Sequence, residues 1–353
     1  MSRFFSPKYK ELIPYTPGEQ PKEMKYIKLN TNESPFPASK KAVAEAAKAT
    51  GMLQLYSDPE SRALCEKLAE TYGVSCDEVI ATNGSDEVLN FAFMAFCDDV
   101  HPAVFPDITY GFYTVFADIN RVPYTEIPLR DDFTVDINDY IGVGKTIFLA
   151  NPNAPTGIAL SRDELEKIIA SNPDNIIVID EAYVDFGAES CIPLIHKYDN
   201  LLVTGTFSKS RSMAGARLGF GIACKELIRD LNTIKYSTNP YNVNRMTCAA
   251  GIGVLCDEAY TRANCRTIIQ NRAYTERELS KLGFEYTDSR ANFIFAKHPD
   301  IDGTKLYLEL KKRGILVRHF DKPSIVQYNR ITVGRLDQMQ SLIAAIKEIL
   351  EDK

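Results

Sequence analysis

The stretch from residue 204 to residue 219 holds the side chains best suited to chemistry. Ser208 and Lys209 follow the apolar run 200–203, and Arg217 lies a short way further along the chain. The apolar run is typical of a buried strand, and open α/β sheets bind ligands beyond the carboxyl ends of such strands. A lysine held there can lose its charge and form a Schiff base with an aldehyde. A surface lysine after a strand would give the same local pattern, so other segments must decide.

Polar side chains also follow several other apolar runs. They are Ser85 and Asp86 after residues 78–81, Asn153 after 145–150, and Asp180 and Tyr183 after 175–179. The small residues before Ser85 lead into a helix, whose first N–H groups and positive dipole end suit an anion. Because the carboxyl ends of parallel strands meet at one edge of a sheet, we expect these groups to converge.

The converging groups meet the requirements of pyridoxal phosphate (PLP). This cofactor needs an imine-forming lysine and an acidic partner for its ring nitrogen, and Lys209 and Asp180 would supply them. It also needs donors to its ring hydroxylate, for which Asn153 and Tyr183 are candidates. Hydroxyl and guanidinium groups suit its phosphate, and the expected phosphate-binding residues are Ser85, Asp86 through its backbone, Ser208 and Arg217.

The order of strands and helices indicates an α/β fold. Strand-like runs at 78–81, 103–105, 145–150, 175–179 and 200–203 alternate with helical segments, which predicts a mostly parallel sheet in an αβα sandwich. After about residue 240 a long charged helix, 258–282, is followed by short strands and helices. Its arginines, at 262, 266, 272 and 277, are expected on a solvated face.

These patterns predict three parts. Residues 1–27 contain four prolines and form an extended arm, residues 28–240 form the large PLP-binding domain, and residues 241–353 form a smaller α+β domain. A chain of 353 residues is long enough for more than one core.

Composition excludes several classes of function. A net charge of −6 without a basic stripe argues against nucleic-acid binding, and no apolar run approaches the roughly 20 residues that span a membrane. The N-terminus lacks an apolar segment of signal-peptide length. The eight cysteines form no Cys-x-x-Cys pair and the four histidines lack ligand spacing, so we expect no metal and a reducing cytoplasm.

The chain resembles the fold-type I PLP enzymes, and most closely the histidinol-phosphate aminotransferases. The matching segments are collinear and cover almost the whole chain: 29–35, 83–87, 151–157, 180–186, 206–209, 214–219 and 330–334. The resemblance implies transamination between L-histidinol phosphate and 2-oxoglutarate. In the biosynthetic direction the enzyme would transfer the amino group from glutamate to imidazole acetol phosphate, which is a step of histidine biosynthesis. Lys209 would then move the substrate proton as general base and acid.

The resemblance also implies roles for residues that spacing does not assign. Tyr110 would stack on the cofactor ring, Thr206 would lie in the cofactor site, and Tyr56 would reach the cofactor phosphate of a second subunit. A homodimer with shared active sites follows from that last role.

The resemblance places the substrate anion on Arg330, with Arg318, Tyr15 and Asn32 nearby. A planar guanidinium binds carboxylate or phosphate in two-point fashion, which supports that role. From the residues alone, Arg318 could instead pair with an acidic neighbour. Tyr15, in a proline-rich arm, could reach an active site or a neighbouring subunit, or could simply pack.

Two positions depart from the family pattern. Ala154 stands where a second asparagine often contacts the ring hydroxylate, so that contact must come from Asn153, from Tyr183 alone, or not at all. Gly205 stands where an arginine is frequent, which leaves one positive charge fewer near the lysine.

Two alternatives remain open from the sequence. One is another PLP reaction on the same scaffold, either an aminotransferase for aromatic or other amino acids or a decarboxylase of a phosphorylated amino acid. The other is a regulatory or binding module without turnover, although both Lys209 and Asp180 are intact.

Overall fold

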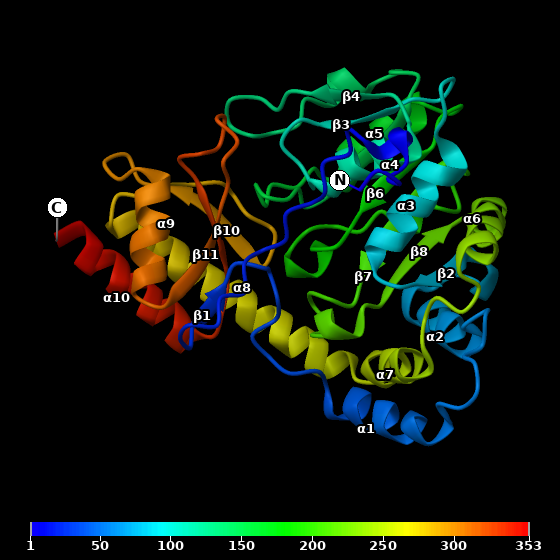
Figure 1. Ribbon diagram of the computed structural model, residues 1–353, viewed down its shortest axis with the longest axis horizontal. Coiled ribbons are helices and arrows are strands. Elements are labelled where there is room, and N and C mark those ends of the chain that lie inside the picture. The colour runs from blue at the N-terminus through cyan, green and yellow to red at the C-terminus, as the bar shows by residue number, and fades with distance from the viewer. Residues whose placement is uncertain (1, 352–353) are drawn as a thin grey trace.

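A seven-stranded sheet forms the larger part of the computed structural model, which describes residues 2–351 (Figure 1). Its strands are β2 (Val79–Thr82), β3 (Ala103–Pro106), β4 (Tyr124–Ile127), β5 (Thr146–Ala150), β6 (Ile177–Asp180), β7 (Leu201–Thr206) and β8 (Gly219–Ala223). They lie in the order β2-β8-β7-β6-β5-β3-β4, and only β8 is antiparallel to its neighbours. The mostly parallel sheet expected from the sequence is confirmed.

Helices cover both faces of this sheet, as near-continuous apolar strands require. On one face lie α3 (Ser85–Phe96), α4 (Phe112–Asn120) and α6 (Lys225–Thr238). On the other lie α1 (Lys40–Ala49), α2 (Arg62–Tyr72), α5 (Arg162–Ser171) and α7 (Arg245–Leu255). A capping box formed by Ser161 and Glu164 begins α5. The arrangement is the expected αβα sandwich.

A second sheet of five strands forms the smaller lobe. Its strands are β1 (Ile27–Leu29), β9 (Glu285–Tyr286), β10 (Phe293–Lys297), β11 (Ile315–His319) and β12 (Asn329–Thr332), in the order β1-β11-β12-β10-β9. Three helices pack on it: α8 (Glu258–Lys281), α9 (Gly303–Lys312) and α10 (Leu336–Glu351). This lobe is the smaller α+β unit expected at the C-terminus.

The boundaries of the two lobes differ from those expected at residues 28 and 241. Strand β1 pairs in parallel with β11, so residues 27–29 belong to the small sheet. At the other boundary, Ala250, Val254 and Leu255 of α7 are buried in the core of the large sheet. An apolar helix face packs wherever it finds a complementary surface, and here that surface belongs to the large lobe.

One arginine of α8 does not lie on a solvated face. Arg272 is buried and donates hydrogen bonds to the carbonyls of Phe186 and Ala291, at 3.1 and 2.6 Å. The expectation for this residue was wrong because α8 packs against the large lobe as well as the small one. Arg262, Arg266 and Arg277 are exposed, as expected.

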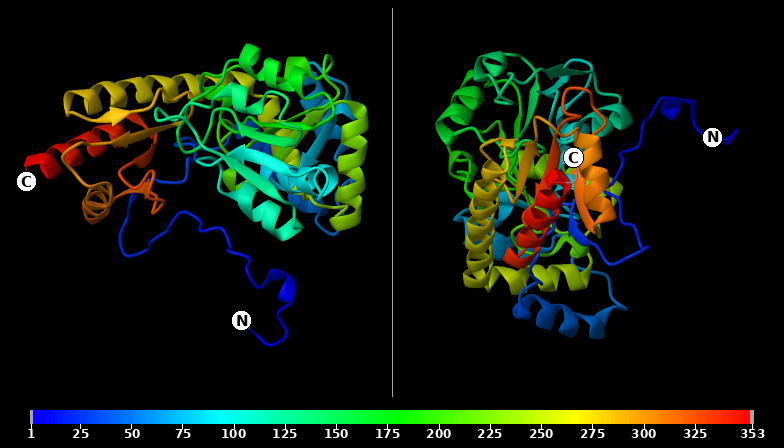
Figure 2. Two further views of the ribbon diagram at one scale, coloured as in Figure 1. Left: turned by 90° about the horizontal axis from the view of Figure 1, so that it is seen from above. Right: turned by 90° about the vertical axis from the view of Figure 1, so that its left-hand side faces the viewer.

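The N-terminal arm has little regular structure within residues 2–26. Figure 2 shows its first segment projecting away from both lobes. Further along, the Arg318 guanidinium donates to the carbonyls of Thr16 and Pro17, at 3.2 and 3.3 Å, and Glu19 pairs with Lys311. The small lobe therefore holds the second half of the arm.

Residues 2–351 contain neither a candidate membrane-spanning helix nor a candidate metal site. None of the helices there combines the length and the apolar character that a membrane crossing needs. Within the same residues, no three histidine, cysteine or acidic side chains come together in an arrangement that could hold a metal ion.

Candidate active site

Two adjoining cavities lie at the carboxyl ends of the large sheet's parallel strands. One has a volume of about 340 Å³ and the other about 410 Å³. The residues that line both are Gly18, Thr31, Tyr110, Ala154, Tyr183 and Lys209. The two cavities are therefore parts of one hollow, with Lys209 on the shared wall.

Lys209 follows β7 and is partly buried. Its Nζ donates to the Thr31 carbonyl at 3.2 Å and lies 5.8 Å from the centroid of the Tyr183 ring. Within residues 2–351 it forms no ion pair. The amine is thus held at the junction by one neutral contact, which leaves it able to react with a group that enters either cavity.

Asp180 ends β6 and lies in the smaller cavity. Burial, with the nearby Asp86 charge, raises the pKa of its carboxyl to about 6. Hydrogen bonds from the Ala182 N–H, the Thr204 hydroxyl and the Tyr113 hydroxyl, at 3.2, 3.3 and 3.4 Å, act in the opposite direction. A cationic group facing this carboxylate would stabilise its ionised form, which is the role expected toward a protonated ring nitrogen.

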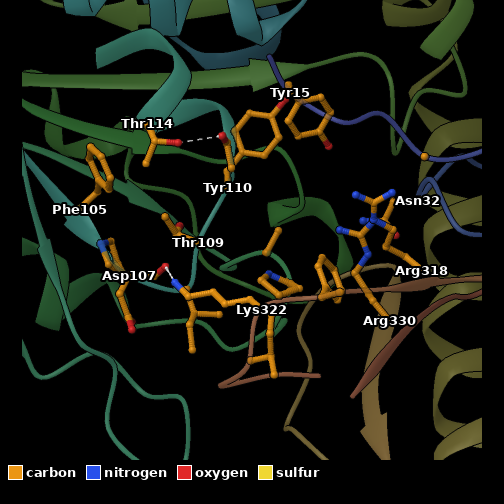
Figure 3. Close-up of a pocket in the computed structure, with 18 of the residues that line it drawn as sticks. Tyr15, Asn32, Phe105, Asp107, Thr109, Tyr110, Thr114, Arg318, Lys322 and Arg330 are labelled. Atoms are coloured by element: carbon orange, nitrogen blue, oxygen red, sulfur yellow. Dashed lines mark hydrogen bonds between the residues drawn. The ribbon is translucent and has the colours of Figure 1, made fainter. Parts of the chain in front are cut away.

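Thr204 and Tyr113 were not anticipated from the sequence. Thr204 stands directly opposite Asp180 in the register of β6 and β7, and Tyr113 lies one turn after Tyr110 at the start of α4. A sequence-based search could have found Thr204 by aligning the two strands. Lys322 was also missed: its Nζ donates to the Asp107 carbonyl at 2.7 Å across the larger cavity (Figure 3).

The N-terminus of α3 forms one end of the smaller cavity. Asp86 accepts hydrogen bonds from the Tyr110 hydroxyl at 2.7 Å and from Arg217 at 2.8 Å. Gly84 and Gly219 are required here. A Cβ on Gly84 would lie 2.6 Å from Arg217 Nη2, and one on Gly219 would lie 2.3 Å from the Ser85 nitrogen. The backbone amides, hydroxyls and guanidinium thus surround a space suited to a phosphate.

The residues of this cavity fit PLP. It is lined by an amine, a buried carboxylate, several hydroxyls and a guanidinium beside a helix N-terminus, which are the groups the cofactor needs. The predicted cofactor residues that line it are Ser85, Asp86, Tyr110, Asp180, Tyr183, Thr206, Ser208, Lys209 and Arg217.

Two predicted cofactor residues do not line this cavity. The Asn153 side-chain amide donates to the Ile108 carbonyl at 2.9 Å and accepts from the Thr109 hydroxyl at 2.7 Å. The loop that follows β3 therefore occupies both polar atoms of the Asn153 side chain. Tyr56 is 78% exposed and stacks on Tyr241 at a centroid distance of 4.5 Å. On its own chain Tyr56 is therefore outside the hollow.

Asn153 consequently does not replace the contact missing at Ala154. Ala154 lines both cavities, as expected for the position beside the ring. The Tyr183 hydroxyl accepts a hydrogen bond from Asn32 Nδ2 at 3.0 Å. Because the Tyr183 oxygen accepts from Asn32, the Tyr183 hydroxyl proton can be donated into the hollow. Tyr183 is therefore the remaining candidate donor to the ring hydroxylate of the cofactor.

Arg330 is one of the cationic side chains that line the larger cavity, together with Arg318, Lys322 and Lys209. Its guanidinium donates to the Asn30 carbonyl at 3.1 Å, while its buried Nε has no hydrogen-bond partner and no acidic side chain within residues 2–351 pairs with it. Burial lowers its pKa, but a guanidinium stays protonated in proteins. A half-buried cation that lines a cavity and has no acidic partner is suited to an anionic ligand.

In Figure 3 Asn32 and Arg318 lie beside Arg330, and Tyr15 lies beside Tyr110. Arg318, Asn32 and Tyr15 all line the larger cavity. Arg318 binds backbone carbonyls of the arm, and among residues 2–351 it forms no ion pair with an acidic side chain. Tyr15 stacks on Phe112 at 4.3 Å, and the arm thereby forms part of the cavity wall.

The space at Gly205 is filled by Phe220. A Cβ on Gly205 would lie 2.3 Å from the Phe220 ring, so the strand accepts no larger residue without movement. A buried cation is present nearby all the same: Arg211, 4% exposed, pairs with Glu258 at 2.5 Å. Next to it, Ser210 donates to Asp185. These contacts fix the turn directly after Lys209.

Comparisons with known proteins agree with this geometry. The family model described as aminotransferase class I and II matches residues 24–346. A histidinol-phosphate aminotransferase of Brachyspira hyodysenteriae is 48% identical over the whole of both chains, and one of Bordetella parapertussis is 47% identical over 99% of each.

Solved structures share the fold. A histidinol-phosphate aminotransferase of Sinorhizobium meliloti in complex with pyridoxal 5'-phosphate has a TM-score of 0.85 at 22% identity, covering 93% of this chain and 92% of that one. One of Clostridium acetobutylicum has a TM-score of 0.85 at 23% identity, covering 92% and 99%. The chain therefore belongs to the class I and II aminotransferases and, within them, to the histidinol-phosphate aminotransferase family of PLP-dependent enzymes.

Proposed function

We propose that this enzyme exchanges an amino group between L-histidinol phosphate and 2-oxoglutarate, and so serves histidine biosynthesis. The identity of the curated relatives supports this substrate pair. The observation that carries the proposal is Arg330, a half-buried guanidinium whose buried Nε has no hydrogen-bond partner and which pairs with no acidic side chain of residues 2–351, in the cavity that Lys209 also lines. A substrate with an anionic group at one end and an amine beside Lys209 matches that arrangement.

Each residue of the smaller cavity has a role in this proposal. Bound PLP supplies an electron sink for the carbon that loses its proton. Lys209 removes that proton and returns it, because its amine lies at the junction of the two cavities. Asp180 keeps the ring nitrogen protonated, and Tyr183 donates to the ring hydroxylate.

The remaining cofactor contacts follow from the surrounding walls. Tyr110 stacks on the ring, with its hydroxyl anchored on Asp86. The first amides of α3 and the side chains of Ser85, Thr206, Ser208 and Arg217 would hold the cofactor phosphate. Arg217, which donates to Asp86 here, would supply a positive charge to it.

Four residues bind the substrate in this proposal. Arg330 binds the phosphate of L-histidinol phosphate or a carboxylate of 2-oxoglutarate, and Arg318 adds a second guanidinium nearby. Asn32 orients Tyr183, and Tyr15 closes the cavity from the arm side. The two guanidinium groups and the Tyr15 side chain would replace water around the bound anion. Because charges interact more strongly where water is excluded, the contacts between the guanidinium groups and the anion would be stronger.

We further propose a cytoplasmic homodimer with shared active sites. Tyr56 is 78% exposed on its own chain, and exposed Leu53 and Leu55 lie beside it, as expected for a segment that reaches a second subunit. The projecting start of the arm carries Phe4, which is 81% exposed. None of the eight cysteines, all within residues 2–351, forms a disulfide, which supports a reducing compartment.

The half-reaction tests the substrate directly. Purified holoenzyme is mixed with L-histidinol phosphate without a keto acid, and the visible absorbance of the bound cofactor is followed. Conversion to the pyridoxamine form is expected, with aspartate, phenylalanine and threonine phosphate as slower controls. Conversion by a control compound alone would contradict the substrate, and no cofactor absorbance after added PLP would contradict the role of Lys209.

Size measurement in solution tests the assembly. The native mass should be twice that of the 39.6 kDa chain. A Tyr56→Phe variant should remain dimeric but bind PLP more weakly, because it loses one hydroxyl donor to the phosphate. A monomer that is fully active would contradict the shared site.

A further inference from the structure

A third cavity, of about 530 Å³, lies away from the active site against one face of α6. Its walls come from α6, from the start of α2, from the 3₁₀ turn Cys76–Glu78 and from the first residues of β2. The active-site phosphate region lies beyond the opposite end of β2, at Ser85. The two sites are therefore separated by the length of that strand.

Lys235 lines this cavity and is only 1% exposed. On α6 it continues the buried stripe of Ile228 and Leu231, at helical spacing, where the pattern calls for an apolar residue. A lysine at such a position is expected only where its ammonium has a specific partner.

No such partner exists within residues 2–351. The Lys235 ammonium forms no hydrogen bond or ion pair there, and its one recorded contact is with the Tyr236 ring, at 5.1 Å. Burial lowers its pKa, while the nearest acidic residues act only through space. An uncompensated buried ammonium is costly, and an anion in the cavity would relieve that cost.

The rest of the lining carries more positive than negative charge. The basic residues are Arg62, Lys225, Arg229 and Lys235, and the acidic ones are Glu60 and Asp77. Arg62 already pairs with Glu60 and Lys225 with Asp77, at 3.5 and 2.8 Å. Arg229 forms no ion pair within residues 2–351, so two cations, Arg229 and Lys235, remain without an acidic partner.

We propose that this cavity is a binding site for a phosphate dianion, either inorganic phosphate or the phosphate group of a small ester. Arg229, Asn232 and Lys235 lie on the same face of α6 and provide a guanidinium, an amide and an ammonium. Two positive charges without an acidic partner among residues 2–351, the buried Lys235 and the exposed Arg229, match the charge of a phosphate, and an arginine and a lysine are its usual protein ligands. The site is independent of the substrate proposed above.

Binding is measured by titration calorimetry on the holoenzyme, with inorganic phosphate and with methyl phosphate as probes. The Arg330→Met substitution removes the main anion-binding side chain of the active site. Phosphate that the Arg330→Met holoenzyme still binds is therefore assigned to the α6 cavity. We expect that binding to persist in Arg330→Met and to weaken at least tenfold when Lys235→Met is added. Lys225→Met, on the same helix but with its charge already paired, is the matched control and should weaken it much less.

Binding of both probes, or of inorganic phosphate alone, supports a phosphate site in the α6 cavity and identifies the source of the phosphate. Absence of binding in Arg330→Met, or binding unaffected by Lys235→Met, overturns it. Lys235→Met by itself should fold, because methionine suits the apolar stripe, and should keep the wild-type half-reaction. Failure of the half-reaction in wild-type enzyme would contradict the proposed substrate and leave this site untouched.

Discussion

Replacing Asp180 with asparagine should stabilise the cofactor-free protein while abolishing its catalytic function. The carboxyl of Asp180 is buried at the end of β6, and its pKa is raised from 3.8 to about 6. Asparagine has the same shape and can keep the hydrogen bonds from Ala182 and Thr204. The substitution therefore removes mainly the cost of burying a negative charge.

The size of the effect follows from the pKa. Because one pKa unit corresponds to about 1.4 kcal/mol, a rise from 3.8 to about 6 makes the ionised side chain about 3 kcal/mol less favourable in the folded protein than in the unfolded chain. At a pH below the pKa of the unfolded chain, the raised pKa of the Asp180 carboxyl does not lower the free energy of unfolding, because the group is protonated in both states. The cost grows as pH rises from about 4 to 6 and is complete above 6, so at pH 5 roughly half of it remains.

Thermal and urea unfolding of apoenzyme between pH 5 and pH 8 would measure this. The gain in stability of Asp180→Asn over wild type should be largest at pH 8 and should shrink by about half at pH 5. In holoenzyme the gain should disappear, since the ionised carboxylate then faces the protonated ring of PLP. The half-reaction rate should fall at least a hundredfold, because the neutral amide does not hold that proton.

Glu181 provides the matched control. It is also buried, and burial raises its pKa to about 8, but its carboxylate accepts from the Ser190 hydroxyl and the Cys191 N–H, outside the PLP cavity. Glu181→Gln should therefore also stabilise the protein at pH 8, yet keep cofactor absorbance and turnover. A stability difference for Asp180→Asn that does not vary with pH, or an active Asp180→Asn enzyme, would refute the reasoning.

Three further substitutions test the site and its support. Lys209→Ala should still bind PLP weakly but show no turnover in the half-reaction, and near-wild-type activity would show that another residue is the base. Arg330→Met should lower kcat/KM for L-histidinol phosphate about 10–100-fold, chiefly through KM, because charged hydrogen bonds contribute about 1.5–3 kcal/mol; an unchanged KM would contradict the anion site. Gly205→Ala should lower the free energy of unfolding by about 1–3 kcal/mol, since its Cβ would overlap the Phe220 ring. Gly215→Ala, whose Cβ would meet no atom within 4 Å, is the control and should change the unfolding midpoint little.

Local patterns in the chain predicted five of the seven strands of the large lobe, because β2, β3, β5, β6 and β7 are short apolar runs between turn residues. They did not predict β4, which is exposed, or β8, which is antiparallel to its neighbours. Lys209 and Asp180 line one cavity because parallel strands share a carboxyl edge, which is a property of the topology. The resemblance added Tyr110, Arg330 and Arg318, whose positions no local pattern explains.

Some site residues could not be assigned from their neighbours in sequence. Asn153 is adjacent to the cavity wall, but its amide is used by Ile108 and Thr109 from another loop. Whether a side chain points into a site depends on such competing partners. Thr204 and Tyr113 reach Asp180 only through strand register and helix packing.

The amino-acid sequence alone determined the alternation of strands and helices, the ends of the parallel strands and the chemical groups found there, because these depend on interactions between near neighbours. Only the tertiary structure decided that β1 joins β11 almost three hundred residues later, that Phe220 fills the space at Gly205, and that Lys235 is buried with no acidic partner among residues 2–351. Each of these results from packing between distant segments, whose free energy depends on shape and burial that no local pattern contains.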